Sequence, residues 1–212
     1  LPFLYGSNAG LEMTSGFYGM QAIHTRAHLL QAIYEGVVFS HMTHLNRMRE
    51  RFTDVHTLRV TGGPAHSDVW MQMLADVSGL RIELPQVEET GCFGAALAAR
   101  VGTGVYRDFS EAQREFDVVS TALCAGIEDE FTLNAVMGTW AVTSGITRGL
   151  RDGEAHPYVY GRYVNDGEFI VHEASPTSSG NLEWFTAQWG EISFDEINQA
   201  VASLPKAGGD LF

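Results

Sequence analysis

The chain has 212 residues, of which 45% are hydrophobic, so it can bury the core of one large or two small domains. Its formal net charge of −13 argues against a general binder of nucleic acid or of anionic membranes. A nucleotide ligand stays compatible with this charge, because backbone amides and Mg²⁺ can outweigh distant surface charges. No apolar run approaches the roughly 20 residues that span a bilayer, and the first residues do not resemble a signal peptide. We therefore expect a soluble, cytoplasmic protein.

The cysteines and histidines do not indicate a disulfide framework or a metal centre. Cys92 and Cys124 each lie among small residues, which is typical of free, buried thiols in a reducing compartment. His24 and His28 are four residues apart, but no third ligand is close in the sequence. We predict neither a disulfide nor a zinc site.

A long helix is the first regular element that the sequence predicts. Residues 1–20 are rich in glycine, serine and aromatic residues and are typical of loops. Apolar residues then recur at spacings of three and four from about Thr25 to Arg51, which predicts an amphipathic helix. Its last turn is basic, as the helix dipole favours.

Two successive β-α passages follow this helix. A β-prone run over 58–61 is broken by Gly62-Gly63-Pro64 and precedes a predicted helix over 67–78. A second β-prone run over 80–84 precedes a small-residue segment over 91–99, which we expect to pack tightly on a sheet. Two such passages in a row predict a layered α/β domain.

The glycine turn of the first passage is a candidate anion site. Gly62 and Gly63 let backbone N–H groups approach a ligand that any Cβ atom would block. A helix capped by Ser67 adds unpaired N–H groups and a positive dipole end, which suit phosphate. From these residues alone, a plain βα turn with a serine cap is an equally good interpretation.

Beyond residue 110 the pattern changes to strands. The polar segment 111–117 is a seam, and a short helix is predicted over 120–125. Two hairpins follow, with turns at Gly138-Thr139 and Asn165-Asp166-Gly167. The strands and then the helices predicted for this part are Phe131–Ala135, Trp140–Thr143, Tyr158–Val164, Glu168–His172, Asn181–Gln188 and Phe194–Ser203.

Five motifs are spread over nearly the whole chain. They are Ser15–Met20 with His28–Glu35, Thr61-Gly62-Gly63 with Gly94-Ala95-Ala96, Phe116–Ala122, Gly138-Thr139 and Ser179–Trp184. Together they resemble the motifs of the C-terminal, nucleotide-side domain of the FGGY carbohydrate kinases. The resemblance implies an α/β protein with an actin-like ATPase (ribonuclease H-like) fold, in which a mixed central sheet carries helices on both faces.

The order of these motifs differs from that of the family. Residues 1–115 carry the signature helix and the adenosine motif, whereas residues 116–212 carry the aspartate and phosphate-turn motifs that normally come first. We expect residues 1–212 to form one C-terminal domain in swapped, circularly permuted order. No G-x-D-x-G-T sequence occurs, so the family's N-terminal domain is expected to be missing. Alone, this piece should bind nucleotide weakly and phosphorylate poorly.

The resemblance implies phosphoryl transfer from ATP, with Mg²⁺, to a sugar hydroxyl. The expected acceptor is a ketopentose or keto-sugar acid such as L-xylulose or 3-keto-L-gulonate. Such a reaction needs in-line positioning, charge neutralisation and a base for the hydroxyl proton, and the family assigns that base to the position of Asp117. Residues implied to contact the nucleotide are Gly138 and Thr139 at the phosphates, Ser179 and Gly180 beside it, and Gly62, Gly63 and Ser67 at the adenosine. No side chain is assigned to the metal.

Plainer interpretations exist for each of these residues. From the residues alone, Asp117 is favoured as a helix N-cap or first-turn acid. Gly138-Thr139 can be a simple hairpin turn, and Glu89 is favoured as a solvated loop acid. Three aromatic residues at helical spacing indicate core or interdomain packing: Trp184, Phe185 and Trp189.

Partners and an alternative function follow from the same pattern. The expected partners are the sugar and the missing N-terminal kinase domain. The face where that domain would dock favours self-association, so a homodimer is possible. The alternative to a kinase is a non-catalytic, actin-like module that binds a nucleotide or a partner chain.

Overall fold

The computed structural model describes residues 3–4, 13–85, 90–109, 111–112, 127, 129–151, 153–154, 158–163, 166–176, 178–190 and 192–205. The helix predicted over 120–125 lies outside these residues, and so do Cys124 and Asn165.

The first half of the chain forms the elements that its periodicity predicts. Helix α1 spans Arg26–Arg51. Its entry is fixed by Thr25, whose backbone N–H donates to Nδ1 of His28 at 3.1 Å. His28 therefore has a capping role. The remaining elements of this half are β1 (Thr57–Thr61), the 3₁₀ turn η1 (Gly63–His66), α2 (Asp68–Ser78), β2 (Arg81–Glu83) and α3 (Thr90–Gly102).

Helix α2 begins and ends with the signals expected at helix termini. The Ser67 hydroxyl accepts a hydrogen bond from the backbone N–H of Trp70 at 3.2 Å, as an N-cap does. Gly79 ends the helix at φ 65°, a left-handed conformation that glycine adopts without strain. The helix predicted over 67–78 is thereby confirmed, and β2 is shorter than the predicted strand 80–84.

The second half of the chain forms two antiparallel hairpins and two helices, as predicted. The first hairpin turns at Gly138-Thr139, and the second includes Gly167 at φ 81°. The elements of this half are β3 (Thr132–Met137), β4 (Ala141–Thr147), β5 (Val159–Arg162), β6 (Phe169–Ser175), α5 (Gly180–Gln188) and α6 (Phe194–Ala202).

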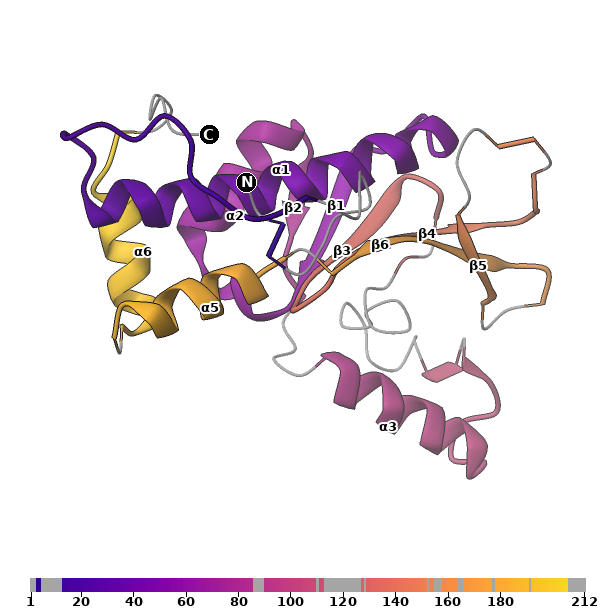
Figure 1. Cartoon of the computed structure of the whole chain (residues 1–212). Coiled ribbons are helices and arrows are strands. Elements are labelled where there is room, and N and C mark those ends of the chain that lie inside the picture. The colour runs from indigo at the N-terminus through magenta and orange to yellow at the C-terminus, as the bar shows by residue number, and fades with distance from the viewer. Residues whose placement is uncertain are drawn as a thin grey trace.

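One six-stranded sheet unites the two halves, in the order β2-β1-β3-β4-β6-β5 (Figure 1). Strand β1 is parallel to β2 and to β3, and every other pairing is antiparallel. The sheet is therefore mixed. The pairing of β1 with β3 joins strands from the two halves, with Thr61 opposite Val136.

The main hydrophobic core lies between the sheet and helices α1, α2, α5 and α6. Helix α1 crosses the sheet and contacts β4 and β6, and it also packs on α2, α5 and α6 (Figure 1). Its Tyr34 ring stacks on Trp70 of α2 with centroids 4.0 Å apart. Phe185 and Trp189 of α5 pack against this core, as predicted, whereas Trp184 is 41% exposed.

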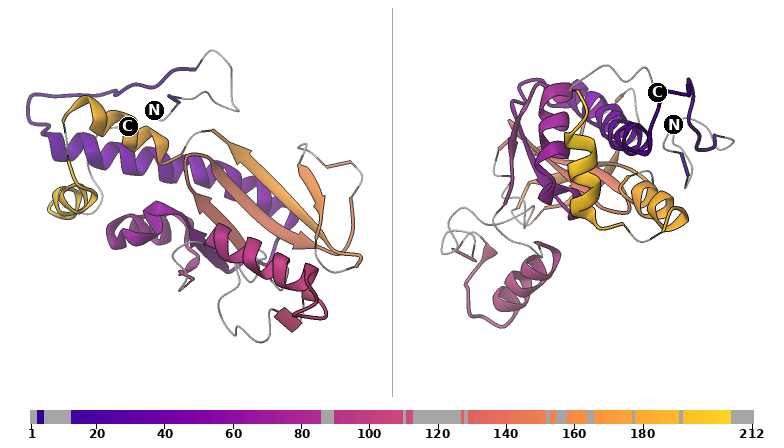
Figure 2. Two further views of the ribbon diagram at one scale, coloured as in Figure 1. Left: turned by 90° about the horizontal axis from the view of Figure 1, so that it is seen from below. Right: turned by 90° about the vertical axis from the view of Figure 1, so that its left-hand side faces the viewer.

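Helix α3 lies on the side of the sheet away from α1, as Figure 1 and the right-hand view of Figure 2 show. Its small residues do not pack tightly on the sheet, so that prediction is wrong. Ala95, Ala96 and Ala98 are exposed, and Leu97 is buried instead in a small cluster with Tyr106 and Ala112. Small side chains permit close packing, but they do not supply the apolar area that drives it.

Cys92 is free, as expected, but it is exposed rather than buried, because it lies near the start of this partly solvated helix. None of the described helices is both long and apolar enough to cross a membrane.

Candidate functional site

The candidate site lies where the parallel strands β1 and β3 end. Parallel strands place their carboxyl ends at one edge of the sheet, so the residues that follow them become neighbours. Gly62 follows β1 and Gly138 follows β3. The two glycine motifs, 76 residues apart in the sequence (138 − 62), therefore meet at one edge.

Close backbone packing explains why a glycine occupies position 62. Gly62 has φ 102°, which side chains other than hydrogen rarely allow. A Cβ atom there would lie 2.8 Å from the carbonyl carbon of Met137 and still closer to its oxygen. The turn after β1 is thus pressed against the turn after β3.

Ser179 holds the second turn from the other side. Its backbone N–H donates to the carbonyl oxygen of Gly138 at 3.0 Å, and its hydroxyl donates to the same oxygen at 2.6 Å. Three predicted nucleotide motifs, led by Gly62, Gly138 and Ser179, are therefore in one continuous set of backbone contacts.

These residues differ in their accessibility to a ligand. Gly62, Gly63 and Thr139 are exposed, and Gly138 is half-buried. The backbone at these positions can therefore be approached from solvent. Ser179 and Gly180 are buried, and Gly180 begins α5, whose N-terminal end carries a partial positive charge. Phosphate oxygens are favoured beside such exposed turns and helix ends.

Ser67 has a different role from its neighbours. It is 1% exposed, and besides accepting from the Trp70 amide its hydroxyl donates to Oδ1 of Asn198 at 2.6 Å. Asn198 also accepts from the Tyr34 hydroxyl at 2.8 Å. The Ser67 hydroxyl thus joins α2 to α6 in the core, and its predicted contact with adenosine remains a prediction.

The predicted base, Asp117, and the loop acid Glu89 lie outside the described residues. Their roles remain predictions. Within the described ranges, no three His, Cys, Asp or Glu side chains are grouped in a way that could hold a metal ion.

A buried histidine beside the site was not singled out from the sequence. His41 of α1 lies with Nε2 3.1 Å from the hydroxyl oxygen of Ser178, which precedes Ser179. Burial, together with a smaller contribution from the nearby His44, lowers the pKa of His41 to about 3, so the ring is neutral at pH 7. The sequence feature that could have identified His41 is the pair of polar residues, at positions 41 and 44, on the apolar face of the predicted helix.

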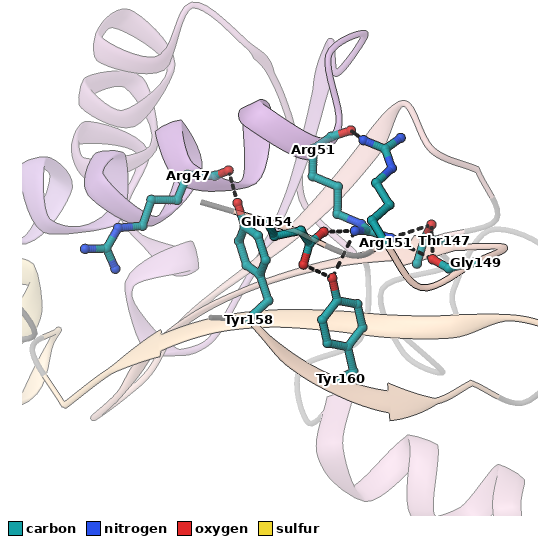
Figure 3. Close-up of polar contacts among 8 residues, drawn as sticks. All are labelled: Arg47, Arg51, Thr147, Gly149, Arg151, Glu154, Tyr158 and Tyr160. Atoms are coloured by element: carbon teal, nitrogen blue, oxygen red, sulfur yellow. Dashed lines mark hydrogen bonds and ion pairs between the residues drawn. The ribbon is translucent and has the colours of Figure 1, made fainter. Parts of the chain in front are cut away.

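A second polar cluster lies at the opposite edge of the sheet (Figure 3). Its centre is Arg51, at the end of α1, whose side chain is 2% exposed and is paired with Glu154. The Arg51 guanidinium also donates to the Tyr160 hydroxyl at 2.9 Å and to the carbonyl oxygen of Gly149 at 2.7 Å (Figure 3). The cluster attaches α1 to the β4–β5 region and is remote from the glycine turns, because β4 runs antiparallel to β3.

A cavity of about 230 Å³ adjoins this cluster. Its walls carry charges of both signs, from Arg51, Arg151, Asp54 and Glu130. These charges offset one another, so the cavity shows no preference for an anion. We therefore assign this edge to stability rather than to the nucleotide.

Comparison with known proteins identifies relatives for the first half. Residues 6–103 match the family described as "FGGY family of carbohydrate kinases, C-terminal domain". The chain is 97% identical over 115 residues to "L-xylulose/3-keto-L-gulonate kinase" of Escherichia coli (strain K12), a match over 54% of this chain and 23% of that protein. It is 65% identical over 113 residues to "Probable L-xylulose kinase" of Pasteurella multocida (strain Pm70), over 53% and 23% of the two chains.

A more distant relative shows the same coverage. The chain is 34% identical over 118 residues to "Xylulose kinase" of Bacillus subtilis (strain 168), over 54% of this chain and 24% of that protein. The matches thus span about a quarter of the length of these curated relatives. No solved structure matches the chain.

Proposed function

We propose that the chain supplies the ATP-binding part of a sugar kinase, because residues 6–103 match the C-terminal domain of the FGGY family of carbohydrate kinases. The observation that carries the proposal is the meeting of the turns at Gly62 and Gly138 with Ser179 at one edge of the sheet. The proposed acceptor is a ketopentose or keto-sugar acid such as L-xylulose or 3-keto-L-gulonate, since relatives named for these sugars are 97% and 65% identical to this chain over 115 and 113 residues.

The proposed domain is one unit whose two segments, 1–115 and 116–212, are in swapped order. The pairing of β1 with β3 supports the single unit, because neither segment alone would contain the complete mixed sheet. Contacts of α1 with β4 and β6 support it further. The swapped order rests on the order of the motifs in the sequence.

The proposed chemistry divides the site into three parts. The turn formed by half-buried Gly138 and exposed Thr139 receives the phosphates, with Ser179 bonded to the Gly138 carbonyl oxygen and Gly180 beside the nucleotide. Gly62 and Gly63 lie against the adenosine side. The carboxylate of Asp117 accepts the proton of the sugar hydroxyl. The hydroxyl oxygen forms a bond to the γ-phosphorus, and the bond from that phosphorus to the β–γ bridging oxygen breaks, which releases ADP.

Mg²⁺ fits this scheme as a partner of the nucleotide. It usually keeps several waters and binds through substrate phosphates and only one or two carboxylates, so it needs no cage of three protein ligands. When bound, it neutralises phosphate charge. We propose that it enters with ATP.

The remaining partners lie beyond this chain. The relatives' further length is proposed to include the N-terminal kinase domain, which would supply most sugar contacts and complete the site. We place the activity in the cytoplasm, where ATP is available. By itself the chain is expected to bind nucleotide weakly and to phosphorylate sugars poorly.

Isothermal titration calorimetry with MgATP tests the proposal. The Gly138→Ala substitution should weaken binding by about tenfold or more without changing the melting temperature, since a Cβ there meets only ordinary contacts, 3.7 Å from the Trp140 carbonyl oxygen. Gly149→Ala, at the opposite edge with nothing within 4 Å of its Cβ, is the matched control and should bind as the parent chain does.

Two outcomes would contradict the proposal. Absence of MgATP binding by the folded parent chain would favour a non-catalytic module that binds a partner chain. Equal binding by the parent and by Gly138→Ala would remove the Gly138 turn from the nucleotide site.

A further inference from the structure

We propose that His41 of α1 is a positioning residue for the phosphate-binding turn, acting through Ser178 on the Ser179–Gly138 contact. This inference rests on the proposed function, in which that turn receives the phosphates of ATP. His41 itself does not reach the exposed face of the turn, because it is 2% exposed.

The contacts form an unbroken series from the helix to the turn. Nε2 of His41 lies 3.1 Å from the hydroxyl oxygen of Ser178, which is fully buried. The next residue, Ser179, donates twice to the carbonyl oxygen of Gly138. Gly138 in turn faces Gly62, where no Cβ would fit. A displacement of Ser178 would therefore move the turn that the ligand is proposed to touch.

One hydrogen bond attaches the His41 ring to the loop before α5. Nδ1 of His41 is buried and has no hydrogen-bond partner in the described part of the chain. The contact of Nε2 with the Ser178 hydroxyl is therefore the one hydrogen bond of the ring among the described residues, and a substitution can preserve or remove it.

The side chain of Ser178 supplies a long-range attachment that its main chain does not. The Ser178 carbonyl oxygen accepts from the backbone and side-chain N–H groups of Asn181, at 3.1 and 2.8 Å, only three residues away. The contact with His41 spans 137 residues and joins the loop before α5 to the centre of α1. It thereby couples the position of the loop to the helix that crosses the sheet.

The test compares His41→Leu with His41→Gln by MgATP calorimetry on the full chain. Leucine removes the hydrogen-bonding atom, so the dissociation constant should rise by about five- to tenfold. Glutamine places an amide group, which can donate or accept, near the position of Nε2 and should restore most of the affinity. Ser178→Ala should reproduce the loss seen with His41→Leu, and the double variant should show no further loss, because both changes remove one interaction.

His44→Leu is the matched control. His44 is also 2% exposed and lies about one turn along the same helix, where the charges of Glu173 and Arg47 influence its pKa. Its replacement should change the melting temperature but leave MgATP affinity unchanged. If His44→Leu weakens binding as much as His41→Leu, or if folded His41→Leu binds as the parent does, the positioning role is overturned.

Amide hydrogen exchange keeps this inference separate from the proposed function. The Ser179 N–H donates directly to Gly138, so its exchange rate reports on that contact without any nucleotide. His41→Leu should accelerate exchange at Ser179, whereas His41→Gln and His44→Leu should not. Unchanged exchange in His41→Leu would refute the coupling, while a failure of the parent to bind MgATP would refute only the proposed nucleotide site.

Discussion

Two adjacent glycines at the candidate site, Gly62 and Gly63, differ in whether the fold leaves room for a side chain. Gly62 and Gly63 are adjacent, and both were expected at the adenosine, yet their surroundings differ. A Cβ at Gly62 would overlap the Met137 carbonyl, whereas a Cβ at Gly63 would meet nothing within 4 Å. The first glycine is required by the fold, and the second leaves space beside the turn.

This difference predicts unequal effects of two alanine substitutions. Gly62→Ala should lower the free energy of unfolding by at least about 2 kcal/mol, because it adds both backbone strain at φ 102° and a steric overlap. Gly63→Ala should change it by less than about 0.5 kcal/mol. Urea denaturation of the two variants measures this, and equal stabilities would contradict the described packing of the turns.

The buried histidines predict how stability depends on pH. Burial lowers the pKa of His41 from 6.5 to about 3 and also lowers the pKa of His44 and His172. Between these values the unfolded chain binds more protons than the folded chain, so stability falls as the pH drops from about 6.5 toward 3.

The substitution His41→Gln removes the contribution of one of these histidines to the pH dependence. Its unfolding free energy should fall less steeply over this pH range, by roughly 1 kcal/mol per pH unit relative to the parent. Denaturation at several pH values, parent against variant, provides the measurement. Parallel pH profiles of parent and variant would show that His41 binds its proton equally in the folded and the unfolded chain, which would contradict the lowered pKa.

At the level of elements, local sequence signals predicted which elements form, although β4 and β6 extend beyond the strands predicted over 140–143 and 168–172. Helix α1 was predicted from Thr25 to Arg51 and spans Arg26–Arg51, since its apolar spacing continues to its last turn. The two hairpins follow from their turn residues. These features depend on neighbours in the sequence, which is why they could be predicted from it.

Contacts between distant elements were less accessible to prediction. The small-residue pattern of α3 does not reveal what covers that helix, and the tight packing expected of it was wrong. The hydrogen bond from Ser67 to Asn198 joins residues 131 positions apart, and no local pattern indicates it. The sequence identified Ser67 as a cap but could not identify the second partner of its hydroxyl.

The Arg51 cluster predicts a large loss of stability when its central charge is removed. Arg51→Met would leave the Glu154 carboxylate, whose side chain is 15% exposed, without its ion-pair partner (Figure 3). The free energy of unfolding should fall by about 3–5 kcal/mol. Chemical denaturation is the measurement.

Arg148→Met is the control for that substitution. Arg148 is also paired, with Glu168, but its side chain is 84% exposed, so its loss should cost less than about 1 kcal/mol. A similar small effect for Arg51→Met would show that the cluster does not hold α1 to the β4–β5 region.

At the level of the whole molecule, two segments share one sheet, and the two edges of that sheet differ in character. The edge at Gly62 and Gly138 presents exposed backbone, and the opposite edge at Arg51 presents a buried ionic cluster. We propose that the nucleotide binds at the first of these edges, where Gly62, Gly138 and Ser179, which come from both segments, are in contact.

Chemical-shift mapping during a titration with MgATP tests this claim most directly. The amides of Gly62, Gly63, Gly138, Thr139 and Ser179 are predicted to shift together and to saturate with one dissociation constant. The amides around Arg51 and Thr147, at the opposite edge, are predicted to stay unchanged. Shifts that appear at the Arg51 edge instead, or none at the glycine turns, would contradict the account.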